Sequence, residues 1–265
     1  MFGSRHVYCS IDKLDEALPH LIELKLGVEV VFDTTVDLWP QIRWEDLLRV
    51  ADRLQDAGVA ATVHGPFHGI NPGSRDPHVR EFSEASLCAA IEVAESLQSP
   101  LVVFHTGFAP QLAPKSRVKW MDLFVPALER VLEEGHRRGV LLAMENTYER
   151  DPSLFTEIFE RVTHPHLQMC LDTGHAQCFG VVDPADWGRE FADRICHVHL
   201  SDNDGQADLH WSLGRGVVSL ESQLKLIAPS RHVVTVTYEV PLEDAAASDD
   251  YFCRYMDNLT KEEAG

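Results

Sequence analysis

The sequence has no C-x-x-C pair, no uninterrupted apolar run of bilayer length and no excess of basic residues. Its six cysteines are scattered, and several lie in apolar segments where a reduced thiol packs as a small core residue. The first ten residues, MFGSRHVYCS, contain no apolar stretch long enough for a secretory signal peptide. These features predict a cytoplasmic protein with a reducing environment and no membrane partner.

Basic residues are scarce, because 23 Lys and Arg face 42 Asp and Glu, which gives a formal net charge of −19. A protein that binds nucleic acid usually gathers Lys and Arg to neutralise phosphates. The segment DTTVDLWPQIRWED, residues 33–46, is also acidic. The charge therefore disfavours nucleic acid as a partner and favours a small molecule, while a homo-oligomer is left open.

The chain also lacks a Pro-rich or low-complexity linker, so we expect one domain over residues 1–265. Eight short β-rich runs alternate with longer stretches of helical period, clearest at 117–138 and 45–57, each followed by a glycine. The expected strands are 6–10, 28–32, 60–65, 101–107, 140–146, 167–172, 195–200 and 233–239. Near-continuous apolar strands that alternate with helices predict a single (β/α)8 TIM barrel. A doubly wound open sheet is the alternative, weakened because no G-x-G-x-x-G follows the first strand.

Polar residues cluster at the carboxyl ends of these expected strands, where the active sites of such barrels lie. Nine of them are of metal-ligand type: His64, His105, Glu145, Asp172, His175, His199, Asp208, His210 and Glu239. Carboxylates and imidazoles suit Zn²⁺ or Mn²⁺. The cysteines are not clustered, which argues against a structural zinc site made of thiolates. We therefore expect a divalent metal cofactor, with at least one ion and at most three ions bound per chain.

The candidates differ in strength when each is taken alone. A single histidine near a strand end, such as His64 or His105, is more often a hydrogen-bonded structural residue than a ligand. Glu145 and Glu239 close apolar runs, where a carboxylate is costly to bury unless it is paired or coordinated. His197 lies one layer deeper than His199, and we assign it to packing or to supporting hydrogen bonds.

The motifs HGPF, FHTG, MENTYE, LDTGHA, HVHLSDNDG, DLHWSLGRG and TYE resemble those of the xylose-isomerase-like barrel superfamily, from about the third strand to the eighth. That superfamily includes sugar isomerases and epimerases and the endonuclease IV class of abasic-site nucleases, also called AP endonuclease family 2. In the epimerase branch, the resemblance implies one ion held by Glu145, Asp172, His199 and Glu239. In the endonuclease branch, it implies three zinc ions held by all nine residues.

The charge favours the first branch, so the expected function is a metal-dependent isomerase or epimerase of a sugar, sugar phosphate or polyol ketone. Glu145 and Glu239 would be the catalytic acid/base pair, transferring a proton next to a polarised carbonyl. Two alternatives stay open: a trinuclear zinc phosphodiester hydrolase of the endonuclease IV kind, and a barrel that binds metal and sugar without catalysis.

Four further residues are candidates for substrate binding. Lys115 belongs to the dense basic cluster PKSRVKW, for which a solvated helix start is the competing interpretation. Arg215, flanked by Gly214 and Gly216, is a candidate for an anionic group because glycines let the backbone approach closely. Trp39 and Trp211 are candidates for the pocket walls.

Overall fold

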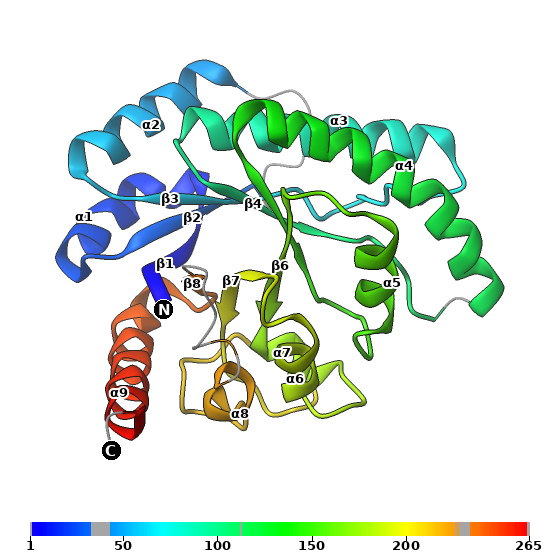
Figure 1. Ribbon diagram of the computed structural model, residues 1–265. Helices are drawn as coiled ribbons and strands as arrows, with labels where there is room; N and C mark the ends of the chain where they lie inside the picture. The colour runs from blue at the N-terminus through cyan, green and yellow to red at the C-terminus, as the bar shows by residue number, and fades with distance from the viewer. Residues whose placement is uncertain (1, 33–42, 112, 226, 228–233, 264–265) are drawn as a thin grey trace.

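Eight parallel strands close into a barrel in which each strand pairs with its sequence neighbours and β1 pairs with β8 (Figure 1). The computed structural model describes residues 2–32, 43–111, 113–225, 227 and 234–263. Helices connect the strands, as parallel pairing requires. The predicted (β/α)8 barrel is confirmed.

All eight predicted strands are present. The strands are β1 (Phe2–Ser10), β2 (Gly27–Val31), β3 (Ala61–His64), β4 (Leu101–His105), β5 (Leu141–Glu145), β6 (Leu167–Asp172), β7 (Ile195–Leu200) and β8 (Val234–Tyr238). β6 and β7 have the predicted bounds, whereas β1 begins at Phe2 rather than at residue 6. The early start follows from pairing, because Phe2 and Arg5 lie in register with Val234 and Val236 of β8.

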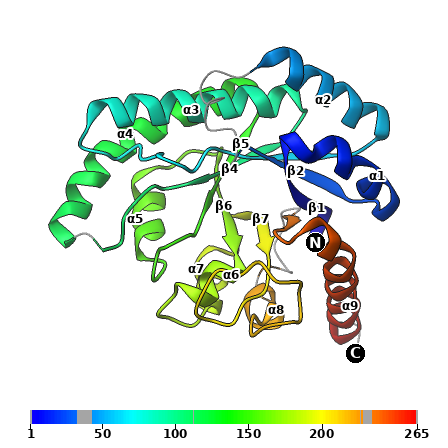
Figure 2. The same ribbon diagram turned by 180° about the vertical axis from the view of Figure 1, so that it is seen from behind.

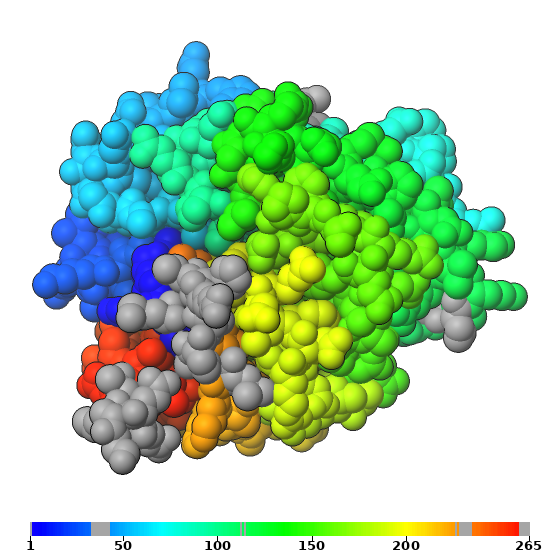
Figure 3. Space-filling model, in the orientation of Figure 1, coloured from blue at the N-terminus to red at the C-terminus, as the bar shows by residue number. Residues whose placement is uncertain are grey.

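The helices lie outside the barrel (Figures 1 and 2). They are α1 (Leu14–Leu24), α2 (Trp44–Ala57), α3 (Pro77–Ser96), α4 (Pro114–Arg138), α5 (Ser153–Arg161), α6 (Thr173–Cys178), α7 (Ala185–Phe191), α8 (Leu220–Leu224) and α9 (Ala245–Glu263), with 3₁₀ turns at Ile11–Lys13 and Leu242–Asp244. Helices α1 to α4 form a continuous surface along one side of the molecule (Figure 3). α2 and α4 end at Gly58 and Gly139 in left-handed conformation, as the glycine positions predicted.

Side-chain alternation along the strands separates two environments. Valines such as Val28 and Val30 of β2 face the helices and belong to the main apolar core. On the inner face, Val103, Ala143 and Cys170 form a small apolar cluster between β4, β5 and β6. Because side chains on one face recur at every second residue, the inner face that carries these core residues also carries the strand-end polar residues two positions later.

The C-terminal helix α9 forms hydrogen bonds with both β1 and β8, the first and last strands, which pair to close the barrel. Asp249 of α9 accepts hydrogen bonds from Arg5 Nε of β1 at 2.5 Å and from the Tyr238 hydroxyl of β8 at 2.8 Å. No helix in the described part of the chain is long and apolar enough to cross a membrane.

Gly107 shapes the loop after β4, next to His105. Its φ of +69° lies in the left-handed region, and a Cβ there would collide with the carbonyl oxygen of Ile70 and lie 2.8 Å from the Cα of Asn71. Gly58 has a similar φ of +66°, but a Cβ added there would have nothing within 4 Å. A side chain at Gly58 would therefore cause backbone strain alone, whereas a side chain at Gly107 would cause both strain and a steric clash.

We expect Gly58→Ala to lower the free energy of unfolding by about 1–2 kcal/mol, because the only cost is that of placing a non-glycine residue in the left-handed region. Gly107→Ala adds an overpacking cost of about 1–3 kcal/mol, because two backbone segments must move apart. Urea titration of both variants checks this order. Equal losses of stability in the two variants would show that the approach of the two loops does not depend on the glycine.

Candidate metal centre

The strand-end residues gather at one mouth of the barrel. His64, His105, Glu145 and Asp172 are the last residues of β3, β4, β5 and β6. His199 is the next-to-last residue of β7, and Glu239 directly follows β8. His175 lies in α6, while Asp208 and His210 lie in the loop after β7. Parallel strands in a barrel end at the same mouth, so the fold itself brings these side chains together.

The nine predicted ligands form three groups, in each of which one ligand atom per residue lies within 4.8 Å of the others. The first group is His64, His105 and Glu145; the central group is Glu145, Asp172, His199 and Glu239; the third group is His175, Asp208 and His210. Glu145 belongs to both the first and the central group.

The two carboxylate oxygens of Glu145 face different neighbours. Oε2 lies 3.0 Å from His105 Nε2 and 3.3 Å from His64 Nε2. Oε1 lies 3.1 Å from His175 Nδ1 and 3.5 Å from His199 Nδ1, which is itself 3.2 Å from Glu239 Oε1. One carboxylate is therefore placed to bridge the first and central groups.

The third group centres on Asp208, whose Oδ2 lies 3.2 Å from His175 Nε2 and 2.9 Å from His210 Nε2. His210 has a φ of 48°, in the left-handed region that a non-glycine residue seldom occupies. Strain of this kind persists only where surrounding contacts enforce it, and it is common at functional sites.

Three of the ligand histidines are oriented by backbone carbonyl oxygens. The ring Nδ1 donates to Gly65 O at 2.8 Å in His64, to Asn146 O at 3.0 Å in His175 and to Glu239 O at 2.7 Å in His210. A carbonyl oxygen only accepts, so Nδ1 carries a proton, and Nε2 is the nitrogen that faces the other members of the group. Each Nε2 faces a carboxylate of its own group, and a ring oriented in this way would bind an ion through Nε2.

The central group concentrates negative charge away from water. Glu145 and Asp172 are each 1% exposed, and Glu239 is 5% exposed. Glu145 Oε1, Asp172 Oδ2 and His199 Nδ1 have no hydrogen-bond partner among the described residues. Burial, together with the nearby charges of Glu239 and Glu145, raises the pKa of Asp172 to about 7. Unpartnered oxygen and nitrogen donors in this arrangement fit a divalent cation such as Zn²⁺ or Mn²⁺.

Two supporting residues had no role in the sequence analysis. Asn146 accepts from the backbone N–H of Asp172 at 2.8 Å and donates to the carbonyl oxygen of Asp172 at 2.9 Å. Its own carbonyl oxygen holds His175, so one side chain and its backbone fix two ligands. The sequence feature that could have identified Asn146 is its position directly after Glu145, inside the MENTYE motif.

Asp202 organises the loop that carries Asp208 and His210. Its buried carboxylate accepts backbone N–H groups from Asn203 at 2.9 Å, Gly214 at 3.0 Å, Gly216 at 2.8 Å and Val218 at 3.0 Å. A Cβ at Gly216 would collide with this carboxylate. The glycine therefore allows the backbone to approach Asp202, a different reason from the anion contact expected at Arg215.

The expected substrate residues are less clearly placed. Arg215 is exposed, and its guanidinium lies 4.0 Å from Asp244. Lys115 is exposed in the first turn of α4, as the competing interpretation held. Trp211 is half-buried, and its backbone pairs with that of Asp202. Trp39 lies outside the described residues. The roles of all four stay predictions.

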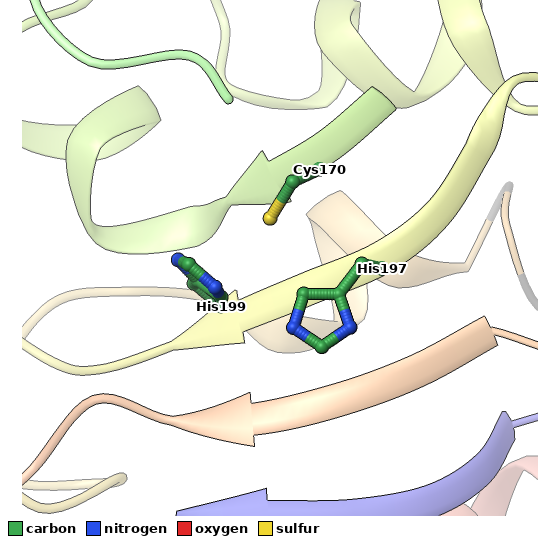
Figure 4. Close-up of side chains that lie close together, drawn as sticks. All are labelled: Cys170, His197 and His199. Carbon is green, nitrogen blue, oxygen red and sulfur yellow. The ribbon is translucent and has the colours of Figure 1, made fainter. Parts of the chain in front are cut away.

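Below the ligands, Cys170 of β6 points toward the side of β7 that carries His197 and His199 (Figure 4). These three residues also have ligand atoms within 4.8 Å of one another. Both ring nitrogens of His197 are already bonded, Nδ1 with Thr235 Oγ1 and Nε2 with Glu29 Oε2. Burial raises the pKa of the Cys170 thiol well above its usual value. Cys170 and His197 therefore fit a packed layer beneath the central group, to which His199 belongs, better than a further metal site.

Known proteins share this architecture. The sequence profile of the xylose isomerase-like TIM barrel family matches residues 26–254. The protein MJ1311 of Methanocaldococcus jannaschii is 27% identical over 247 residues, 89% of this chain and 82% of that protein. A probable endonuclease 4 of Symbiobacterium thermophilum is 27% identical over 217 residues, 73% of this chain and 75% of that protein.

Solved structures agree on the fold. The TTHB071 protein from Thermus thermophilus, soaked with ZnCl2, superposes with a TM-score of 0.81 at 27% identity and covers 98% of this chain and 99% of its own. A D-tagatose 3-epimerase-like protein superposes with a TM-score of 0.87 at 24% identity, with the same coverage of both chains. The second likeness shows the fold alone.

We expect Glu145→Gln to remove two of three bound ions, because Glu145 serves both the first and the central group. His210→Ala should remove only the ion of the third group. Elemental analysis of protein loaded with zinc and freed of excess metal measures both numbers. The exposed His20 of α1 offers a matched control, since His20→Ala should keep the full metal content. Unchanged metal content in Glu145→Gln would refute the shared-ligand assignment.

Proposed function

The chain belongs to the xylose isomerase-like TIM barrel family, and on this premise we propose that it is a metal-dependent hydrolase that cleaves a phosphate ester of a small molecule with three divalent ions. One observation carries the proposal: nine carboxylates and imidazoles form three groups, two of which share Glu145. This proposal takes up the hydrolase chemistry that the sequence analysis held as its first alternative.

The residues outside the central group distinguish the two enzyme classes. A mononuclear isomerase or epimerase needs only the central group, whereas this chain also carries five further donors. These are His64, His105, His175, Asp208 and His210. Three of the four histidines among them have their tautomer set by a backbone carbonyl. Side chains oriented in this way support metal binding at all three groups.

Ions held in the three groups would supply Lewis acidity toward phosphoryl oxygens and would acidify a water molecule. The chain itself contributes position and exclusion of water. Phe67 packs its ring 5.4 Å from that of His64 and 5.7 Å from that of His105. On the other side, Phe179 lies 5.6 Å from the ring of His175. These apolar rings flank the first and third groups and lower the local dielectric, which strengthens electrostatic interactions at the mouth.

The net charge limits the substrate. Duplex DNA carries one negative charge per roughly 1.7 Å of its axis, and a chain with a net charge of −19 repels it at long range. A small phosphate ester presents one or two charges, which ions held in the three groups would neutralise. The proposal therefore combines the chemistry of the endonuclease branch with a small-molecule substrate.

A second candidate function is the isomerase or epimerase expected from the sequence. It is favoured by the central group, in which Glu145 and Glu239 both approach His199 Nδ1, at 3.5 and 3.2 Å. Two buried glutamates beside one ion would serve as the acid/base pair for proton transfer next to a carbonyl. In that case the third group would contribute nothing to turnover, which makes His210 the discriminating residue.

The zinc-loaded protein should hydrolyse p-nitrophenyl phosphate or bis(p-nitrophenyl) phosphate, and His210→Ala should slow this reaction by about 100-fold or more. The reason is that losing an ion removes several kcal/mol of transition-state stabilisation. Release of p-nitrophenolate gives the rate, and His20→Ala serves as the control with unchanged activity.

The same protein is incubated with ketoses and their phosphates in D₂O and with abasic-site duplex DNA. Deuterium entering the carbon next to the carbonyl, unaffected by His210→Ala and lost in Glu239→Gln, would establish the second candidate and contradict the hydrolase. Cleavage of the duplex would show that charge does not limit the substrate. Sugar binding without reaction in any of these assays would identify a barrel that binds metal and sugar but has no catalytic activity.

A further inference from the structure

A further carboxylate lies deeper in the barrel, with an oxygen within 4.8 Å of ligand atoms of His64, His199 and Glu239. Glu29 is the middle residue of β2, between Val28 and Val30, and it is completely buried. An ionised carboxylate in such a place is costly unless donors surround it. A glutamate at the centre of an apolar strand is therefore a feature that the fold must support by specific contacts.

One oxygen of Glu29 is fixed by three donors from three strands. Oε2 accepts from Thr62 Oγ1 of β3 at 3.1 Å, from Thr237 Oγ1 of β8 at 2.9 Å and from His197 Nε2 of β7 at 2.9 Å. These bonds leave Glu29 Oε1 pointing elsewhere, 3.0 Å from His199 Nε2. Neither atom has a hydrogen-bond partner among the described residues, so their separation of 3.0 Å is the contact that links Glu29 to His199.

His199 thereby differs from the other ligand histidines whose ring partners are known. His64, His175 and His210 direct one nitrogen to a neutral backbone carbonyl. His199 instead directs Nε2 to a buried carboxylate and Nδ1 to the central group. A carboxylate acceptor fixes the tautomer and makes the opposite nitrogen a stronger donor to a metal than a carbonyl does.

His197, the other imidazole that contacts Glu29, is bonded through both of its ring nitrogens. Its Nε2 donates to Glu29 Oε2, and its Nδ1 is bonded with Thr235 Oγ1. His199 is therefore the imidazole that links Glu29 to the central group. Thr62 and Thr237 fix the position of Glu29 but carry no charge.

We propose that Glu29 is a positioning residue for the central ion: its carboxylate holds the proton of His199 on Nε2 and keeps the lone pair of Nδ1 directed at Glu145, Asp172 and Glu239. This inference deepens the proposed metal site and rests on it, but it does not depend on which reaction the site performs.

The test is a zinc competition titration with a chelator, without substrate, on the unmodified chain and on Glu29→Gln. The amide keeps the size of the side chain and removes its charge. We expect one of the three ions to bind about 10- to 100-fold more weakly, while the other two keep their affinity. In the zinc-loaded protein labelled with ¹⁵N at histidine, the His199 Nε2 proton should move upfield, because its acceptor is no longer anionic.

Glu149→Gln provides a matched control. Glu149 is 4% exposed and also accepts from threonines, Thr106 Oγ1 at 2.7 Å and Thr147 Oγ1 at 3.3 Å, but its described contacts include no predicted ligand. We expect all three ions to bind this variant as they bind the unmodified chain. Equal weakening of all ions in Glu29→Gln, or no weakening, would overturn the positioning role in favour of a structural one.

Glu29→Asp keeps the test decisive if the glutamine variant does not fold. Aspartate retains the charge but shortens the reach toward His199 by one methylene. We expect a smaller weakening, again confined to one ion and accompanied by a shift of the same His199 proton. Unchanged affinity and an unchanged proton signal in this variant would contradict the proposal. Absence of phosphate ester hydrolysis would leave these measurements unaffected.

Discussion

Three carboxylates that converge away from water set the main physical constraint on this molecule. Glu145, Asp172 and Glu239 approach one imidazole, His199, and all four residues are at most 5% exposed. Like charges at this separation cannot all stay ionised in a medium of low dielectric unless a cation neutralises them. This repulsion contributes to the raised pKa of Asp172, and a divalent ion bound between the carboxylates would relieve it. The barrel must therefore be stable enough to hold the four side chains together.

The interior of the barrel has an apolar side and a polar side, and both support the four side chains. Beneath the mouth, β4, β5 and β6 present a small apolar cluster that includes Val103 and Ala143. On the other side, β2, β3, β7 and β8 present Glu29 and the groups that donate to it. The apolar half supplies burial, and the polar half supplies a fixed negative charge behind His199. Asp202 extends the same principle above the mouth, where four backbone N–H groups fold the loop with Asp208 and His210 around one carboxylate.

Much of this arrangement could be predicted from sequence, for a physical reason. Strand ends in a parallel barrel share one mouth, so residues such as His64 and Glu239 could be placed together although 175 positions separate them. The division into three groups could not be predicted, because it depends on which oxygen of Glu145 faces which neighbour. Glu29 was overlooked because a single charge in an apolar run gives no periodic signal, and its partners lie on strands far along the chain. The glycines beside Arg215 showed close backbone approach but not that its target is Asp202.

Anomalous diffraction from crystals of the zinc-loaded protein, recorded at the zinc absorption edge, tests the central claim most directly. The account predicts three peaks at the barrel mouth: one among His64, His105 and Glu145, one in the central group, and one among His175, Asp208 and His210. A single peak confined to the central group, at saturating zinc, would contradict the trinuclear site and with it the proposed hydrolase.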